Sequence, residues 1–184
     1  MMLLKDILYG VSLSAVSGST NVMVNTIVFD SRKVQLDDVF VAIRGTVTDG
    51  HKYIGQVVAA GAKAIICEEL PLDMVNGVVY VEVDNGNKAL AIMASNYYGN
   101  PSKNLKLIGV TGTNGKTTVS SLLYQLFKKA GFKVGLISTI KIMVDEEVYT
   151  TSHTTPDALT INYHMFLMNE VGVEYCFMEV SSHG

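Results

Sequence analysis

The sequence predicts an α/β protein of two domains, the second built on a largely parallel sheet. Apolar runs of strand length alternate with amphipathic stretches of helical length along the chain, a pattern typical of α/β units. A glycine-rich stretch, Gly109–Thr118, lies between one such run and one helical stretch, which is the setting of a phosphate-binding loop. Gly99, Asn100 and Pro101 interrupt the alternation. We therefore expect domains of residues 1–103 and 104–184.

Composition argues against several classes of protein, among them nucleic-acid-binding and membrane proteins. The 184 residues are 48% hydrophobic and 17% charged, with a formal net charge of −3 and no basic run. Nucleic acid is therefore not an expected partner, because affinity for it comes mostly from lysine and arginine. No apolar run reaches transmembrane length, and the N-terminus is too broken for a secretory signal, so we expect no membrane insertion and a cytoplasmic protein. Cys67 and Cys176 lie in apolar runs, which predicts buried thiols without a disulfide or metal role.

The first domain is expected to open with a short helix, because Leu3, Leu4, Ile7 and Leu8 recur at helical spacing before Gly10. Alternating apolar residues predict the first strand, and a continuous apolar run predicts that the second is buried on both faces. Helical periodicity and a closing Gly61 predict the next helix. The expected strands cover residues 22–29, 38–43, 63–67 and 78–83, and the later helices cover residues 51–60 and 88–98.

The second domain follows the same reasoning. Its expected strands cover residues 105–108, 133–138 and 174–180, and Asp145 and Glu146 predict a hairpin between residues 140–144 and 147–150. Helices are expected over residues 119–130, ending at Gly131, and from Thr154 to about Val171. A parallel sheet is normally covered by helices on both faces, and this domain offers only two helices. Because the last strand also brings polar residues to its end uncovered, we expect the chain to be part of something longer.

The glycine-rich stretch carries the clearest chemistry. Glycines let successive backbone N–H groups turn towards a phosphate, and the following helix N-terminus adds partial positive charge. Lys116 would then reach the β- and γ-phosphates of a nucleotide, and the Thr117 hydroxyl would bind Mg²⁺. The strict pattern has glycine at position 110, where this chain has Val110, and Gly112 lies inside the loop instead.

Other polar residues have a structural and a functional interpretation. Glu179 ends an apolar strand, where an acid of a phosphate-loop protein holds Mg²⁺, although a strand-end carboxylate can be ordinary. His183 is either a metal or phosphate ligand or simply solvated. Thr154 and Thr155 either cap a helix or bind an anionic substrate there. His51 and Lys52 are expected to be solvated on a surface helix. Residues 30–32 and 44–50 are polar clusters at neighbouring strand ends, and composition alone does not make them a site.

Several motifs together resemble one family. Residues 111–118 look like the ATP-binding loop of the Mur ligases, which build the peptide stem of the bacterial cell wall. Residues 178–184 resemble the strand motif of the branch that adds the third stem residue. Segments 30–32, 38–45, 49–50 and 153–156 resemble its substrate-binding segments, in the same order. The resemblance implies a small uridine-nucleotide-binding α/β domain followed by the first part of an ATPase domain with a mainly parallel sheet.

The resemblance also implies residue roles. Contacts to the uridine nucleotide of UDP-N-acetylmuramoyl-L-alanyl-D-glutamate match Phe29, Ser31, Thr46, Val47 and Thr48. The ATP loop matches Gly112, Thr113, Asn114, Gly115, Lys116, Thr117 and Thr118. Contacts to the muramoyl-dipeptide match His153, Thr154, Thr155 and Ser181. Glu179 matches an acid that binds Mg²⁺, and His183 matches a residue near the metal ions. Lys116, Glu179 and His183 are therefore the expected catalytic residues.

The implied reaction is ATP-dependent amide formation. ATP phosphorylates the free D-glutamate carboxylate, and the acyl phosphate then reacts with the amine of a diamino acid. The resemblance places a carbamylated lysine and the domain that selects this amino acid beyond residue 184. We therefore predict a chain that does not complete the reaction alone, or, as the alternative, an isolated module that binds the UDP-muramoyl-peptide or nucleotide. An unrelated phosphate-loop kinase or GTPase would have no use for segments 30–32 and 44–50. A folate-polyglutamating ligase would not need the first domain.

Overall fold

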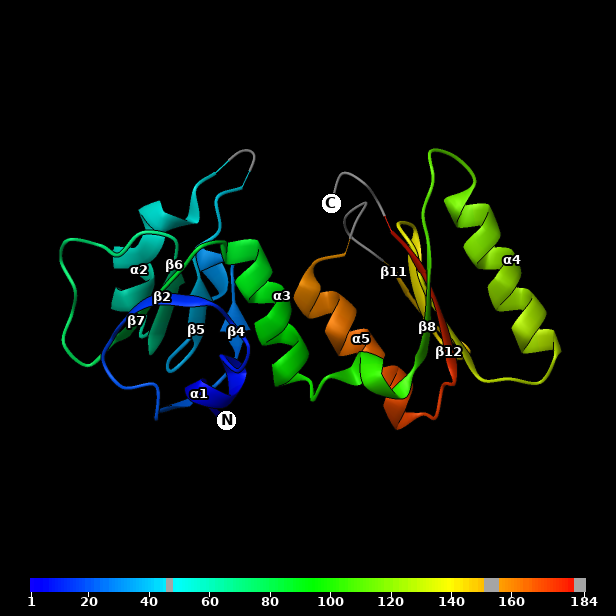
Figure 1. Ribbon diagram of the computed structural model, residues 1–184, viewed down its shortest axis with the longest axis horizontal. Coiled ribbons are helices and arrows are strands. Elements are labelled where there is room, and N and C mark those ends of the chain that lie inside the picture. Colours follow the sequence, from blue (N-terminus) through cyan, green and yellow to red (C-terminus); the bar gives the residue numbers. More distant parts are fainter. Residues whose placement is uncertain (46–47, 151–155, 181–184) are drawn as a thin grey trace. The chain divides into compact units, whose positions relative to one another are not determined.

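The computed structural model describes residues 1–45, 48–150 and 156–180. The chain forms two compact units, Met1–Tyr97 and Tyr98–Gly184, called unit 1 and unit 2 below (Figure 1). Both are α/β, as predicted. The division falls a few residues before the boundary expected after residue 103, because the turn η3 (Pro101–Asn104) packs on helix α5 (Ala158–Glu170) of unit 2.

Unit 1 is built on a five-stranded sheet with the order β2-β7-β6-β5-β4. The four strands β4 to β7 are parallel, and β2 pairs antiparallel with β7. Strand β5, predicted to be covered on both faces, is buried throughout, as is β6. The five strands are β2 (Leu13–Ser17), β4 (Ile27–Val28), β5 (Val39–Val41), β6 (Ala64–Cys67) and β7 (Val79–Val83).

Short helices complete unit 1. The expected first helix is α1 (Leu4–Ile7), and the predicted helix over residues 51–60 consists of a 3-10 turn, η2 (Gly50–Tyr53), continued by α2 (Ile54–Ala59). The third expected helix is α3 (Gly86–Tyr97). Helix α2 shares a hydrophobic core with the sheet, made of Phe40, Ala42, Ile54, Val57, Ala62, Ile65, Cys67 and Tyr80.

Two short strands replace the single strand predicted over residues 22–29. The first, β3 (Met23–Val24), pairs antiparallel with β1 (Met2–Leu3) in a separate two-stranded sheet, and only β4 joins the main sheet. The chain turns between β3 and β4, where the Thr26 N–H donates to the carboxylate of Asp38 at 3.3 Å. Asp38 is buried, so its hydrogen bonds fix this turn. A carboxylate twelve residues away is invisible to the local alternation of apolar residues.

Unit 2 is built on a second five-stranded sheet, with the order β11-β10-β9-β12-β8. Strands β8, β12 and β9 are parallel, and β10 pairs antiparallel with both β9 and β11. The predicted hairpin is therefore confirmed, with Asp145 at a positive φ of 51° in its turn. The strands are β8 (Lys106–Val110), β9 (Val134–Ile137), β10 (Lys141–Val144), β11 (Glu147–Thr150) and β12 (Tyr175–Glu179).

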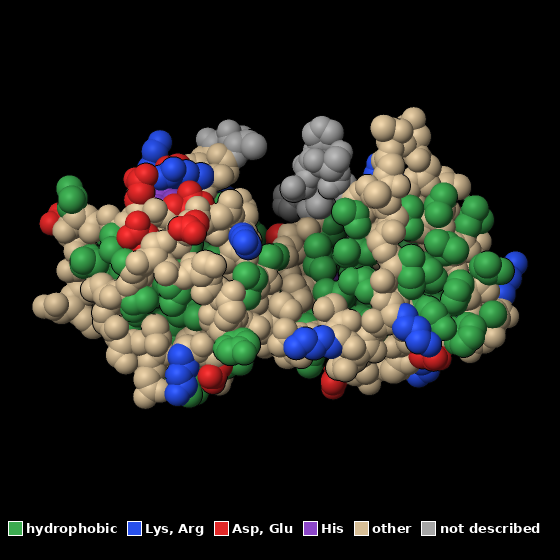
Figure 2. Space-filling model, viewed as in Figure 1, with side chains coloured by type: hydrophobic (Ala, Val, Ile, Leu, Met, Phe, Trp, Pro, Cys, Tyr) green, Lys and Arg blue, Asp and Glu red, His purple; other side chains and the backbone are tan. Residues whose placement is uncertain are grey.

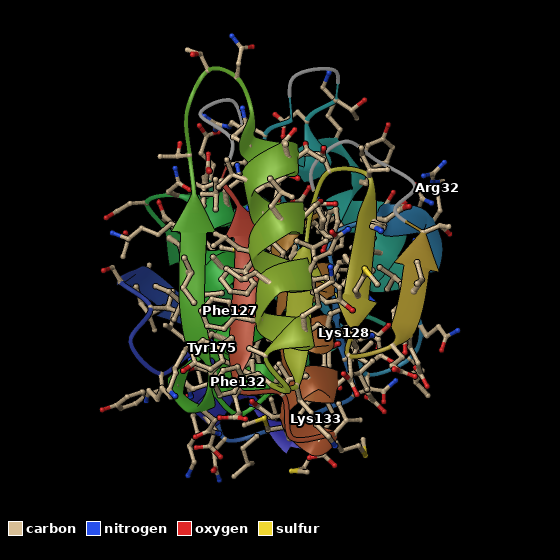
Figure 3. The ribbon with its side chains drawn as sticks, turned by 90° about the vertical axis from the view of Figure 1, so that its right-hand side faces the viewer. Arg32, Phe127, Lys128, Phe132, Lys133 and Tyr175 are labelled. Carbon is tan, nitrogen blue, oxygen red and sulfur yellow. The ribbon has the colours of Figure 1, made fainter. Side chains whose placement is uncertain are left out.

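One helix covers each face of this second sheet. Successive residues of a strand point to opposite faces, and Phe177 packs in the cluster of Tyr124 from α4 (Lys116–Lys129), whereas Cys176 packs in that of Met168 from α5. Figures 1 and 3 show α4 lying along the sheet. The cover is partial, because β8 at one edge of the sheet and β11 at the other stay largely exposed. In the part of the chain that the structure describes, no helix has the length and apolar character needed to cross a membrane.

Aromatic rings fix the C-terminal end of α4 against the sheet. The ring centroids of Phe127 and Tyr175 are 4.7 Å apart, and those of Phe132 and Tyr175 are 5.1 Å apart. Lys106 adds a cation–π contact, with Nζ 4.4 Å from the centre of the Tyr175 ring. The three labelled rings lie together at one end of the sheet in Figure 3. Because Tyr175 begins β12, this is the amino-terminal end of the parallel strands, opposite the phosphate loop.

Both cysteines are free and fully buried, as predicted. Burial raises the pKa of the Cys67 thiol to about 11 and that of Cys176 to about 12, because a thiolate is poorly solvated in an apolar interior. Neither thiol is therefore a nucleophile at neutral pH.

A cap joins strand β4 to the turn that follows it. The Asp30 carboxylate caps η1 (Ser31–Lys33), accepting the Arg32 N–H at 3.1 Å. It also accepts two hydrogen bonds from the Arg32 guanidinium, at 2.9 and 2.8 Å. These bonds lower the pKa of Asp30 from 3.8 to about 2, because they favour the charged carboxylate.

We expect Arg32→Ala to raise the pKa of Asp30 back towards 3.8, as followed by NMR titration of the side-chain carboxyl carbon. Because the pKa of the folded chain lies below the ordinary value, the stabilisation from this pair is present above about pH 4 and is lost as the pH falls towards 2. Lys33→Ala, which removes only a minor charge effect on Asp30, is the control. An Asp30 pKa near 3.8 in the unsubstituted chain would contradict the structure.

Gly135 of β9 is a second test of the fold. A Cβ atom added there would lie 2.4 Å from Sδ of Met168, which is fully buried under α5. We expect Gly135→Ala to lower the free energy of unfolding by about 1–3 kcal/mol through overpacking, measured by urea denaturation.

Met168→Ala alone should cost about 2–5 kcal/mol through a cavity. The double variant should cost less than the sum, because the new methyl group fills that cavity. Gly55→Ala in α2, where a Cβ meets nothing within 4 Å, should leave stability unchanged or raise it. Additive effects of Gly135→Ala and Met168→Ala would show that a methyl group at position 135 does not contact Met168.

Candidate functional site

The phosphate-loop stretch links β8 directly to α4. Residues Thr111–Gly115 are all exposed, and α4 begins at Lys116, three residues before the predicted start. Gly112 and Gly115 have positive φ angles of 145° and 80°, which only glycine adopts readily. Gly115 is the N-cap of α4 and provides no side-chain cap. The first N–H groups of α4 therefore lack a capping side chain at this position, as a phosphate site requires.

Val110 explains the departure from the strict glycine pattern. It is the last residue of β8, it pairs with Glu179 of β12, and its carbonyl accepts the Val180 N–H at 2.9 Å. Position 110 therefore belongs to the strand and not to the turn, so the extra freedom of glycine is not needed there. The turn instead begins at Thr111 and uses the glycine at 112.

Lys116 folds back over this turn. Its Nζ donates to the Gly112 carbonyl at 2.7 Å, so the ammonium group lies against the loop that precedes its own helix. Lys116 is partly buried, whereas the loop residues before it are exposed. The predicted cationic residue and the predicted glycines are thus brought together.

Glu179 lies beside the phosphate loop, as predicted. The parallel pairing of β12 with β8 aligns Glu179 with Val110, so the carboxylate stands at the strand end next to the loop. Two hydroxyl groups contact it: Ser120 Oγ of α4 lies 3.3 Å from Oε1, and Thr139 Oγ1, after β9, lies 3.4 Å from Oε2. Three elements therefore meet at this carboxylate. The nearness of Ser120 and Thr139 to Glu179 follows only from strand order and has no local signal in the sequence.

The residues present fit a magnesium ion held mainly by phosphate and water. Within the described ranges there is no cluster of three or more His, Cys, Asp or Glu side chains that could hold a metal. Mg²⁺ commonly keeps several waters and takes one or two carboxylates plus phosphate oxygens. A single carboxylate, Glu179, and a single hydroxyl, Thr117 in the first turn of α4, match that pattern.

The candidate substrate residues of unit 1 lie at one edge of its sheet. Phe29 and Ser31 follow β4, Thr48 follows β5, and these strands are parallel, so their carboxyl ends meet at the same edge. Ligands bind at this edge in open α/β sheets. Phe29 is 38% exposed and Ser31 is half-buried. The edge therefore carries an exposed aromatic ring and a half-buried serine.

His51 corrects the expectation of a solvated side chain. The side chain is only 13% exposed. Its Nδ1 lies 2.7 Å from Oδ1 of Asp49, and its Nε2 accepts the Glu68 N–H at 2.9 Å. The ring is buried because η2 places it against the end of β6. The only local signal was an acid two residues earlier, which forms the cap of η2.

Charged residues lie next to His51 along the same edge of the sheet. Arg44, after β5, forms ion pairs with Glu68, at 3.5 Å, and with Glu69. Glu68 Oε1 also accepts the N–H of Gly86, the first residue of α3, at 2.8 Å. Figure 2 shows acidic, basic and histidine side chains gathered at one place on unit 1. We call Arg44, Asp49, His51, Glu68 and Glu69 the edge cluster.

The edge cluster shifts the ionisation of its members. Hydrogen bonds from the His51 N–H and side chain lower the pKa of Asp49, and Glu69 raises the pKa of Arg44. Glu68 and Glu69 follow a strand without any recognisable motif, so the sequence alone does not predict their place in the edge cluster.

Seven predicted site residues lie outside the described residues, and their roles stay predictions. They are Thr46, Val47, His153, Thr154, Thr155, Ser181 and His183.

Comparison with known proteins matches both units. A model of the Mur ligase family catalytic domain matches residues 23–98, and a model of the Mur ligase middle domain matches residues 110–184. The chain is 49% identical over 183 residues to the UDP-N-acetylmuramoyl-L-alanyl-D-glutamate–2,6-diaminopimelate ligase of Cytophaga hutchinsonii. It is 47% identical over 182 residues to the ligase of the same name from Bacteroides fragilis. Each alignment covers 99% of this chain and 38% of the relative.

Solved structures of Mur ligases also match this chain. A structure of a ligase with the same name matches 100% of this chain and 36% of its own, with a TM-score of 0.76 and 25% identity. The MurF ligase from Thermotoga maritima, in complex with ADP, matches 84% of this chain and 31% of its own, with a TM-score of 0.51 and 28% identity. Since two models of one family together match most of the residues, and relatives nearly half identical align with almost all of them, the chain belongs to the Mur ligase family.

Proposed function

We propose that the chain forms the substrate-binding and ATP-binding parts of a UDP-N-acetylmuramoyl-tripeptide synthetase. Such a ligase of peptidoglycan synthesis would add a diamino acid to UDP-N-acetylmuramoyl-L-alanyl-D-glutamate. The observation that carries the proposal is 49% identity, over 99% of this chain, to a ligase named for that substrate. The relatives carry 2,6-diaminopimelate in their names, whereas for this chain we propose only a diamino acid, because the chain spans 38% of their length.

The proposed ligation requires a site that holds ATP next to the carboxylate that is phosphorylated. A carboxylate is a poor electrophile, so the D-glutamate oxygen first attacks the γ-phosphorus of ATP, which releases ADP and leaves an acyl phosphate. The diamino acid nitrogen then attacks the acyl carbon, an amide bond forms, and inorganic phosphate leaves. In the first step the protein mainly positions the reactants and stabilises the charge of the transferring group.

Unit 2 supports the nucleotide half of this proposal. The Lys116 ammonium would hold the β- and γ-phosphates, together with the N–H groups of the glycine loop and the first turn of α4. Thr117 and Glu179 would hold Mg²⁺, which supplies positive charge to the phosphate oxygens. Ser120 and Thr139 would orient the Glu179 carboxylate through the contacts described above. His183 remains a predicted catalytic residue.

Unit 1 supports the uridine-nucleotide half. The exposed ring of Phe29 offers a face on which a base can stack, and Ser31 offers a hydroxyl group for a hydrogen bond. Thr48 lies at the same edge and is exposed. Since ATP and UDP-linked precursors are compounds of the cytoplasm, we propose that the protein acts there.

The separate cores of the two units favour a narrower second function for the chain on its own. Each unit has its own hydrophobic clusters, so unit 1 can hold its edge in place without contacts from elsewhere. The isolated polypeptide would then bind the UDP-muramoyl-dipeptide without completing the ligation. Turnover by the 184-residue chain would exclude this second function and support the first.

Calorimetric titration of the chain with UDP-N-acetylmuramoyl-L-alanyl-D-glutamate, and with UDP for comparison, should show saturable binding. Ser31→Ala should weaken it by about 2–10-fold, the effect of one lost hydrogen bond. Ser19→Ala is the matched control, because Ser19 follows the end of β2 that pairs with the beginning of β7, at the opposite edge of the sheet. An unsubstituted chain that is folded by circular dichroism yet binds neither ligand would count against the proposed unit 1 site.

Titration with ATP and Mg²⁺ tests unit 2. Lys116→Ala should weaken binding by about 10–100-fold, because it removes a charge-assisted hydrogen bond to phosphate. Ser120→Ala should weaken the Mg²⁺-dependent part of the affinity by a few-fold, since Glu179 loses one hydroxyl contact. Ser121→Ala, the neighbouring serine without that contact, should change nothing. Equal effects of the two serine substitutions would show that Ser120 does not act through Glu179.

A further inference from the structure

The His51 ring joins two parts of the unit 1 edge that are far apart in sequence. On one side is the loop base, which we define as Arg44, Gly45, Thr48, Asp49 and Gly50. On the other side is Glu68, directly after β6. The ring bonds to Asp49 through Nδ1 and to the Glu68 N–H through Nε2. This histidine is thus the side chain through which the loop base contacts the backbone at the end of β6.

The loop base is itself well defined by backbone contacts. The Gly45 N–H donates to the Thr48 carbonyl at 3.0 Å, Arg44 and Asp49 form an antiparallel bridge, and the Gly50 N–H donates to the Ile43 carbonyl at 2.9 Å. A Cβ at Gly50 would lie 2.9 Å from the Ile43 nitrogen, so the two chain segments touch closely there. Backbone contacts therefore tie the residues of the loop base to one another and to Ile43.

The hydrogen bonds select one form of the ring. A backbone N–H can only donate, so Nε2 must be the unprotonated nitrogen, and Nδ1 then carries the hydrogen and donates to the Asp49 carboxylate. Protonation would place a hydrogen on Nε2, pointing at the Glu68 N–H, and two donors repel each other. The hydrogen bond from the Glu68 N–H to His51 therefore exists only while Nε2 of the ring is unprotonated.

Glu68 links the His51 contact to other residues at the same edge of the sheet. Its carboxylate accepts the Gly86 N–H at the start of α3 and pairs with Arg44. Gly86 packs so closely on β5 that a Cβ there would lie 3.0 Å from the Ala42 carbonyl. The backbone of residue 68 is thus held between His51 on one side and its own side-chain partners on the other. Loss of the Nε2 bond would loosen the loop base from this assembly.

We propose that His51 is a positioning residue for the UDP-muramoyl-peptide site, holding Thr48 and the rest of the loop base in the binding geometry only when its ring is neutral. The proposal rests on the proposed function of unit 1. The charged groups around the ring are Asp49 beside it, Arg44 on the loop base, and Glu68 and Glu69 after β6. A ring that takes up a proton at Nε2 can no longer accept the Glu68 N–H. Ligand affinity should therefore fall as His51 is protonated.

Two substitutions separate the two bonds of the ring. The side-chain oxygen of glutamine can take the place of Nε2 as acceptor for the Glu68 N–H, and glutamine does not titrate. The side-chain nitrogen of asparagine can take the place of Nδ1 as donor to Asp49, but asparagine is too short to reach Glu68. His51→Gln should therefore keep affinity within about threefold, whereas His51→Asn should weaken binding by about fivefold or more, as a buried N–H loses its partner.

The experiment is a calorimetric titration of the 184-residue chain and both variants with UDP-N-acetylmuramoyl-L-alanyl-D-glutamate at a series of pH values from 8 to 5.5. The diphosphate diester and the carboxylates of this ligand stay ionised over most of that range. The affinity of the unsubstituted chain should fall with acidification, and that of His51→Gln should stay nearly constant. Urea denaturation of each variant at each pH separates loss of binding from loss of folding.

An NMR measurement of the ring nitrogens tests the geometry without a ligand. The ¹⁵N shifts should show the hydrogen on Nδ1 of neutral His51, and a ring with the hydrogen on Nε2 would overturn the proposal. Equal loss of binding in His51→Gln and His51→Asn, or the same pH profile in His51→Gln as in the unsubstituted chain, would overturn it while leaving the proposed function intact. A folded chain that does not bind the ligand even at pH 8 would overturn both.

Discussion

The pairing of β12 with β8 is the contact on which the chemistry of unit 2 depends. Parallel register aligns Glu179 with Val110, so the acid and the beginning of the phosphate loop lie side by side although they are far apart in sequence. Because β12 also pairs with β9, Thr139 reaches the same carboxylate from the other side. One parallel strand inserted between two others thus gathers the nucleotide loop, the proposed metal ligand and its two hydroxyl partners. The aromatic cluster of Phe127, Phe132 and Tyr175 packs at the opposite end of these strands.

In unit 1, too, parallel strands bring distant segments together at one edge of the sheet, but the side chains there are different. Its parallel strands end at one edge, where segments after β4, β5, β6 and β7 supply Phe29, Arg44, Glu68 and Gly86 in turn. No glycine-rich loop serves this edge within the described residues; ion pairs and the His51 bonds hold the segments instead. The two edges therefore differ in character. One is shaped by backbone conformation, and the other by a network of ion pairs and side-chain hydrogen bonds.

Much of this architecture follows from local sequence patterns. Most strands and helices were predicted within a few residues, because apolar periodicity reports burial directly. The phosphate loop and Glu179 were predicted because each has a motif. The break between β3 and β4 escaped prediction, since it depends on the buried Asp38, and so did β2, whose Leu13 and Val16 are more than 40% exposed. Glu68, the distant partner of His51, and the hydroxyl partners of Glu179 follow from strand order, which no local pattern reveals.

The folded-back Lys116 has a consequence for selectivity. Its ammonium group already has an acceptor, the Gly112 carbonyl, so an incoming ligand must compete with the loop itself for this cation. A nucleoside without phosphates brings no negative charge and cannot replace the bond it would break. A polyphosphate repays that loss several times over through charge-assisted bonds. The Gly112 carbonyl therefore competes for the Lys116 ammonium, and this competition favours ligands that carry several negative charges.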